Sequence, residues 1–302
     1  MFYLALSLLK LVAFPLSFLP RKLFLGLGRG LGALLFRFNF RVKVARENIW
    51  LAFPEKSEGE KEKLLRDSYL ELGITFLELL RLFYRFDRFL DRYCDVENAH
   101  YLQNARKPKG CFCLTSHVGN WEVMTAAGPN LTQVPTLMVT KRLKPEWLNR
   151  VVEVTRSLLH IRMAFEPRTM PEIVRALKRN DAIGFVMDQY AGAPVGARVP
   201  FFGKPVGSHT ALATLALRMG VPVVPGIAVR KPDGRYLVRF DPPLKLEDRG
   251  DPDATVIANT ALFVRHTEAW IREFPAQWLW IHRRWKGDLS PLPPNVEGEM
   301  LR

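Results

Sequence analysis

The stretch "TSHVGNWEVM", Thr115 to Met124, places a histidine and a glutamate at a spacing that suits proton transfer. His117 ends an apolar run, and Glu122 follows five residues later. A carboxylate on one imidazole nitrogen fixes the tautomer and makes the other nitrogen a stronger base. Such a pair can remove a proton from an alcohol. The alternative interpretation is structural, since a single histidine near a helix start is commonly a packing residue.

The elements around His117 are expected to be a strand over 110–115 and a helix over 120–128, ended by Gly128. His117 should then stand at the carboxyl end of the strand, where open α/β sheets bind ligands. Further strands and helices alternate along the chain, with strands at 136–140, 182–187, 221–229 and 236–240 and helices at 146–159, 171–179, 208–219 and 252–274. This order predicts an α/β fold with a mostly parallel central sheet flanked by helices.

The N-terminal segment is apolar and basic. Residues 1–46 contain eight basic residues and no acidic one, and the net charge of the chain is +14. Lys10, Pro15 and Arg29 interrupt the apolar runs, so neither is a clean span of about 20 residues. We predict a helical membrane anchor over 1–45 that either spans the bilayer or lies in its interface. The alternative is a pair of buried core helices. The glycines at 26, 28, 30 and 32 indicate close helix packing.

The rest of the chain is predicted to form a single catalytic domain over 46–290, followed by a flexible tail over 291–302. Ser57 and Glu60 have the spacing of a capping box and predict a helix running to about Tyr84. Cys111 and Cys113 should share one face of a strand as core residues. Three cysteines without a CxxC pair predict no disulfide framework and favour a reducing compartment.

Two other function classes fit the sequence poorly. The six histidines form no HExxH or His-x-His pair, so a metal hydrolase is not favoured and no metal site is predicted. A nucleic-acid-binding protein would explain the positive charge, but not its location on an apolar segment, and no nucleic-acid partner is predicted. A non-catalytic membrane scaffold remains open if the His117–Glu122 pair is inert.

Five stretches resemble, in the same order, the motifs of the late (secondary) lipid A acyltransferases, a family of the glycerolipid acyltransferase superfamily. The stretch "HVGNWE" resembles the His-x4-acid motif. The others are "ENIWLAFPEKS", "FVMDQYAG", "VPFFGKPVGSHTALATLALRMGVPVVP" and "FPAQWLWIHRRWK". The resemblance extends from the apolar N-terminus to about Lys286. It implies a glycerolipid acyltransferase-like fold.

The resemblance also implies roles for residues of the histidine motif. His117 corresponds to the general base and Glu122 to its orienting carboxylate. Asn120 matches the motif and is a candidate for substrate binding or for shaping the loop. Arg156 stands about where the family has a functional arginine, although Arg162 lies nearby.

Four further residues match later motifs. Asp188 and Gln189 match the family's Asp-Gln element. Asp188 is expected to hold a basic residue or the acceptor, and Gln189 is a candidate for substrate binding. Arg283 and Arg284 could contact phosphate, or could form ion pairs that close the domain. The tryptophans around them are expected in the core rather than against an acyl chain.

The function implied is transfer of a fatty acyl chain from an acyl carrier protein thioester to a hydroxyl of a lipid A precursor, without a cofactor. No Gly-x-Ser-x-Gly nucleophile is present or needed. Coenzyme A remains open as the donor, and a lysophospholipid, an aminolipid or another glycolipid as the acceptor. The expected location is the inner membrane of a Gram-negative bacterium, with the catalytic domain on the cytoplasmic face.

Overall fold

A seven-stranded sheet forms the centre of the computed structural model, which describes residues 2–81, 83–287 and 289–290. Its strands are β1 (Cys94–Glu97), β2 (Cys111–Thr115), β3 (Thr136–Thr140), β4 (Ile161–Phe165), β5 (Ala182–Val186), β8 (Val223–Arg230) and β9 (Tyr236–Phe240). Their order is β1-β9-β8-β2-β5-β3-β4, and only the β8–β9 pair is antiparallel. The predicted α/β class with a mostly parallel sheet is confirmed. The predicted tail, 291–302, lies outside the described residues.

Helices cover both faces of this sheet, because successive side chains of each buried strand point to opposite sides. Cys111 and Cys113 of β2 belong to one core cluster, and Phe112 and Leu114 belong to the other. The first face carries α5 (Phe86–Tyr93), α6 (Ala99–Ala105) and α7 (Trp121–Leu131). The second carries α9 (Met170–Lys178), α10 (Ala211–Met219) and α11 (Pro252–Glu273). All three cysteines are free and buried, as the core interpretation predicts.

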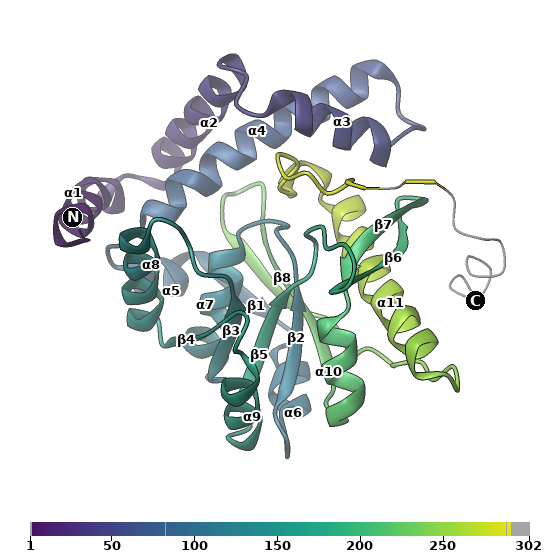
Figure 1. Cartoon of the computed structure of the whole chain (residues 1–302). Helices are drawn as coiled ribbons and strands as arrows, with labels where there is room; N and C mark the ends of the chain where they lie inside the picture. Colours follow the sequence, from purple (N-terminus) through teal and green to yellow (C-terminus); the bar gives the residue numbers. More distant parts are fainter. Residues whose placement is uncertain (1, 82, 288, 291–302) are drawn as a thin grey trace.

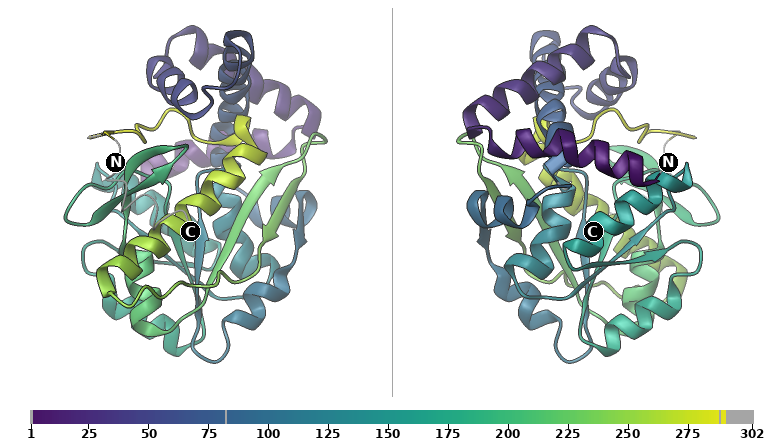
Figure 2. Two further views of the ribbon diagram at one scale, coloured as in Figure 1. Left: turned by 90° about the vertical axis from the view of Figure 1, so that its right-hand side faces the viewer. Right: turned by 90° about the vertical axis from the view of Figure 1, so that its left-hand side faces the viewer.

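Four N-terminal helices gather at one end of the molecule (Figures 1 and 2). They are α1 (Phe2–Phe18), α2 (Arg21–Arg37), α3 (Val42–Ala52) and α4 (Glu58–Arg81). The carboxyl ends of β2 and β5 point toward this layer (Figure 1). Within the described residues, no single helix has both the length and the apolar composition to cross a membrane. The pair α2 and α3 has both, with a bend of 95° between them.

The helices α2 and α4 approach each other through glycines. A Cβ on Gly32 would lie 2.1 Å from the backbone oxygen of Tyr69, and a Cβ on Gly73 would lie 2.2 Å from the Gly32 nitrogen. Gly28 has a similar contact with Ile74, whereas Gly26 and Gly30 face open space. The prediction of close helix packing therefore holds for two of the four alternating glycines.

The boundaries of α4 follow the capping prediction at its start. The Ser57 amide donates to Glu60 Oε2 at 2.8 Å, and the Glu60 amide donates to Ser57 Oγ at 3.3 Å. The helix ends at Arg81, three residues before the end predicted at about Tyr84.

Helix α7 continues through Gly128 to Leu131, so the predicted end at Gly128 is wrong. A Cβ on Gly128 would lie 2.3 Å from the Thr136 hydroxyl oxygen. The glycine therefore permits close approach of α7 to β3 rather than ending the helix.

The hairpin of β6 (Gly196–Phe201) and β7 (Lys204–His209) was not predicted. It takes up Ser208 and His209, which were expected to begin a helix, and α10 starts at Ala211 instead. The turn before β9 forms as predicted, with Gly234 at a φ of 85°.

Candidate active site

His117 and Asp188 meet at the carboxyl ends of two neighbouring strands. β2 and β5 pair in parallel, with Thr115 opposite Val186, so the residues after each strand converge. Asp188 Oδ1 lies 2.8 Å from His117 Nδ1, and Asp188 Oδ2 accepts a hydrogen bond from the His117 backbone amide at 2.8 Å. With Nδ1 donating to the carboxylate, Nε2 carries the lone pair. Nε2 has no hydrogen-bond partner among the residues that the structure describes.

The surroundings of this pair lower the pKa of Asp188 and raise the pKa of His117. Burial opposes charge on both groups. Their mutual attraction opposes burial, and hydrogen bonds from Trp278 and the His117 amide further favour the carboxylate. The pKa of Asp188 therefore falls from 3.8 to about 2, and the pKa of His117 rises above 6.5. Glu122 adds a smaller charge effect that also raises the pKa of His117. The imidazole ring also stands edge-on to Trp121, with ring centroids 5.0 Å apart.

Glu122 contacts Arg156 rather than the imidazole. Arg156 Nη2 donates to Glu122 Oε1 at 2.5 Å, and Arg156 Nε donates to Oε2 at 3.2 Å. Glu122 lies in the first turn of α7, where the helix dipole favours an anion. Arg156 comes from α8 (Glu146–Leu158). The carboxylate on Nδ1 is therefore that of Asp188, because the strand end approaches the ring while the helix start faces α8.

Asn120 and Gln189 have different positions. Asn120 is 1% exposed, and its Oδ1 accepts hydrogen bonds from the Glu122 and Val123 amides, which caps α7. Its Nδ2 donates to Glu78 Oε2 at 3.1 Å. These contacts use both ends of the amide, so Asn120 shapes the turn between His117 and Glu122. Gln189, by contrast, lines the groove described below.

Trp278 is a site residue that sequence reasoning placed only in the core. It is 4% exposed, and its Nε1 donates to Asp188 Oδ2 at 2.7 Å. Asp188 Oδ2 thus accepts two hydrogen bonds while Oδ1 faces the imidazole. The only sequence signal was the position of Trp278 within the last motif.

The two C-terminal arginines lie in unlike surroundings. Arg284 is 1% exposed and donates to the Gly207 carbonyl and to Ser208 Oγ, each at 2.6 Å. Burial lowers its pKa to about 10, and the described residues give it no carboxylate partner. Arg283 is exposed. Arg284 therefore fastens the last motif to the β7 strand through a carbonyl and a hydroxyl, whereas the expectation named phosphate or ion pairs.

The motif "ENIWLAFPEKS" contacts the motif "FPAQWLWIHRRWK" at the second face of the sheet. Asn48 Nδ2 donates to the carbonyls of Trp280 and His282, at 2.7 and 2.6 Å. Phe53 packs against Trp280, with ring centroids 5.8 Å apart. Asn48 and Phe53 therefore join the N-terminal helical layer to the C-terminal motif, which is a structural role.

A groove of about 670 Å³ opens beside His117. Its walls come from the ends of β3 and β5, from α7, and from the segment leading into α10. More than half of the lining residues are apolar, and the charged or strongly polar ones besides His117 are Lys141, Arg156, Glu166, Gln189 and His209. Asp188, Glu122 and Asn120 lie behind this lining. The groove therefore combines an oriented imidazole with space for an apolar chain.

A buried network of charged residues contacts the turn between His117 and Glu122. Glu78 of α4 is 0% exposed and accepts from Arg230, Tyr236 and Asn120, while its other oxygen pairs with Arg21 at 2.7 Å. Arg230 and Arg21 lower the pKa of Glu78 against the effect of burial. Sequence reasoning missed this network because its members are far apart along the chain.

Comparison with known proteins gives a consistent result. A family model described as bacterial lipid A biosynthesis acyltransferase matches residues 2–287. The lipid A biosynthesis lauroyltransferase of Escherichia coli (strain K12) is 25% identical over 277 residues, which cover 89% of this chain and 87% of that protein.

Two further relatives have similar coverage. The lipid A biosynthesis palmitoleoyltransferase of the same strain is 26% identical, over 89% of this chain and 86% of its own length. A lipid A biosynthesis acyltransferase of Haemophilus influenzae is 24% identical, over 92% and 89%.

Proposed function

Because this chain belongs to the bacterial lipid A biosynthesis acyltransferase family and is therefore an acyltransferase, we propose that it moves a fatty acyl chain from an acyl carrier protein thioester to a hydroxyl of a lipid A precursor. The observation that carries the chemistry is the His117–Asp188 pair, because Asp188 occupies Nδ1 and His117 lines a large, mostly apolar groove. An oriented imidazole beside space for an acyl chain is what direct acyl transfer requires.

The proposed reaction begins when His117 Nε2 takes the proton from the acceptor hydroxyl. The alkoxide oxygen then forms a bond to the thioester carbonyl carbon, giving a tetrahedral oxyanion. The carbon–sulfur bond breaks, and the departing thiolate takes the proton back from Nε2. An ester and a thiol result, and His117 returns to its starting state. Asp188 holds the imidazole in the required tautomer and stabilises the imidazolium.

Arg156 is the proposed electrophilic group. Its guanidinium reaches the groove, and Glu122 fixes it through two hydrogen bonds. Nη1 has only the thioether of Met163, at 3.7 Å, among the described residues. An N–H with so weak an acceptor can donate to the developing oxyanion, where a fixed cation acts strongly in a desolvated site. Glu122 thus acts through Arg156 rather than through His117.

Exposed basic residues near the groove support anionic substrates. Lys141 lines the groove, and Arg142 and Lys144 follow it in the same exposed loop. Lys141 and Arg142 lie 3.8 Å from Glu166 and Glu153, so Lys144 is the member of this loop without a described acidic partner. Acyl carrier proteins are acidic and lipid A precursors are phosphorylated, so both would be attracted to this rim. Gln189 is proposed to bind the acceptor from the opposite wall.

The proposed location is the cytoplasmic face of the inner membrane. Helix α1 exposes a series of large apolar side chains, including Leu8, Leu11 and Phe18. It packs against α4 and α8. Leu158 on α8 and Leu143 at the groove rim are also exposed. An apolar surface with basic neighbours and no acid before Glu47 suits the interface of an anionic bilayer.

A transfer assay tests the proposal. Membranes carrying the protein are given acyl carrier protein thioesters or coenzyme A thioesters, and either a tetra-acylated lipid A precursor or a lysophospholipid. We expect transfer from the carrier protein to the lipid A precursor, lost in His117→Ala and retained in His100→Ala, which removes an exposed histidine on α6. Transfer that survives His117→Ala would refute the mechanism. Transfer only to the lysophospholipid would refute the acceptor.

A further inference from the structure

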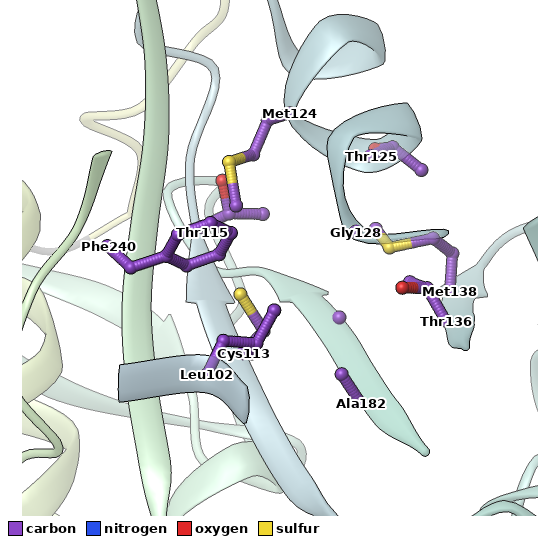
Figure 3. Close-up of a pocket in the computed structure, with 11 residues that line it drawn as sticks. Leu102, Cys113, Thr115, Met124, Thr125, Gly128, Thr136, Met138, Ala182 and Phe240 are labelled. Carbon is purple, nitrogen blue, oxygen red and sulfur yellow. The ribbon is translucent and has the colours of Figure 1, made fainter. Parts of the chain in front are cut away.

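A second, much smaller cavity lies at the inner end of the groove. Its volume is about 20 Å³, and it lies between α7 and the first face of the sheet. Thr125 and Met138 line both the groove and this inner cavity. They are the boundary between the two spaces, and both side chains are 6% exposed. Figure 3 shows side chains from α7, β2, β3 and β9 converging on the inner cavity.

One face of α7 connects the reacting centre with the inner cavity. Trp121 contacts the His117 ring and lines the groove, Thr125 lines both spaces, and Gly128 lines only the inner cavity. Residues three or four apart lie on the same side of a helix, so these positions form one continuous line. Over the seven residues from Trp121 to Gly128 the helix rises about 10 Å.

Strand β3 forms the opposite side of this passage from the groove to the inner cavity, which is called the track below. Thr140 lines the groove, Met138 lines both spaces, and Thr136 lines only the inner cavity. Alternate residues of a strand share a face, so this series also leads inward from the rim. Helix and strand therefore define one path, and Met138 stands across it.

Met138 lies over a glycine that leaves room for it. A Cβ on Gly184 of β5 would be 2.2 Å from Met138 Sδ and 3.0 Å from its Cε. Methionine has three rotatable side-chain bonds and adapts readily to irregular space. Its side chain can thus block the track or leave it without movement of the backbone.

We propose that Met138, lying over Gly184, is the stop that sets the length of the donor acyl chain, and that the inner cavity is the space a longer chain enters. This inference rests on the proposed acyl transfer at His117. The competing occupant of the inner cavity is a water molecule, since its lining includes the Thr115 hydroxyl, which has no hydrogen-bond partner among the described residues.

The test compares kcat/KM for octanoyl, lauroyl, myristoyl and palmitoyl thioesters in three variants. Met138→Ala should move the preference toward longer chains, with about a fourfold gain for each methylene newly buried. Gly184→Ala should push the thioether into the track and move the preference toward shorter chains. Met219→Ala, on α10 outside both spaces, should leave the order of preference unchanged. Thermal unfolding midpoints identify any variant that fails to fold.

Opposite shifts in the first two variants would support the stop. An unchanged order of chain lengths in both folded variants would overturn it, and would assign the inner cavity to water. If Met138→Ala fails to fold, Gly184→Ala alone tests the proposal. A shift of its preference toward shorter chains would support the stop, and an unchanged preference would overturn it. If the wild-type protein transfers no chain to any acceptor, the proposed function fails, and the stop fails with it.

Discussion

Replacing Asp188 with asparagine should impair proton transfer even though it makes the imidazole easier to deprotonate. Asp188 Oδ2 accepts from the His117 amide and from Trp278 Nε1. In Asp188→Asn the side-chain oxygen should stay with these two donors, so the NH₂ group should occupy the place of Oδ1 and face Nδ1. An NH₂ group can only donate to Nδ1. The imidazole proton would then move to Nε2, where the base is needed.

The pKa of Asp188 shows how strongly this site favours a carboxylate. A pKa of about 2 instead of 3.8 corresponds to roughly 2.5 kcal/mol in favour of the carboxylate. His117 supplies part of this, and Trp278 and the backbone amide supply the rest against desolvation. Without the carboxylate, burial should bring the pKa of His117 below its present, raised value. The rate should fall by about 10² to 10⁴, the range of general acid–base catalysis.

The assay is a pH–rate profile of acyl transfer for the wild type, Asp188→Asn and Glu122→Gln. The wild-type rate should rise with pH through an apparent pKa above 6.5, because His117 must be neutral to act as the base. Asp188→Asn should lower both the rate and that apparent pKa. Glu122→Gln should lower the rate through Arg156 and move the apparent pKa less. The reverse pattern, with the larger pKa change in Glu122→Gln, would refute the assignment of Asp188 as the orienting carboxylate.

Three further predictions concern stability. Arg284→Leu should lower the free energy of unfolding by about 2–4 kcal/mol, because it removes two hydrogen bonds that a buried guanidinium donates, to the Gly207 carbonyl and to Ser208 Oγ. Arg283→Ala should change the free energy of unfolding by less than about 0.5 kcal/mol, since Arg283 is exposed; equal losses in chemical denaturation would contradict this. Gly32→Ala should force α2 from the backbone of α4 and lower the thermal midpoint, whereas Gly30→Ala, which faces open space, should raise it slightly. The stability difference between wild type and Asp188→Asn should be largest between about pH 4 and 6.5. It should shrink as pH falls toward 2, because the depressed carboxyl pKa is crossed, and as pH rises through the raised imidazole pKa; a difference independent of pH would exclude the ion pair.

Elements whose formation depends on neighbouring residues were predicted correctly from the sequence. The capping box, the buried strand before His117 and the turn at Gly234 depend on neighbouring residues, and each forms as predicted. The placement of His117 at the carboxyl end of β2 followed from the alternation of strand and helix. Strands β1 and β4 were not predicted, since each is short and carries polar side chains that interrupt the apolar pattern.

The pairing of charged groups could not be deduced in the same way. Glu122 was the obvious partner for His117 because it is five residues away, whereas Asp188 is 71 residues away. The register of β2 against β5 decides between them, and register depends on the whole sheet. Arg156 and Arg162 were both candidates. The structure pairs Arg162, on the edge strand β4, with Asp181, whereas Arg156 pairs with Glu122 and lines the groove.

The N-terminal helices take part in forming the site as well as offering an apolar surface. Arg21 of α2 pairs with Glu78, and Glu78 in turn accepts from Asn120, which caps α7 directly after His117. Removing one partner of a buried charge is strongly destabilising, since the remaining charge is left without compensation. The geometry of the catalytic turn therefore depends on α2 being docked on α4. A displacement of α2 from α4 would reach the turn after His117 through these same contacts.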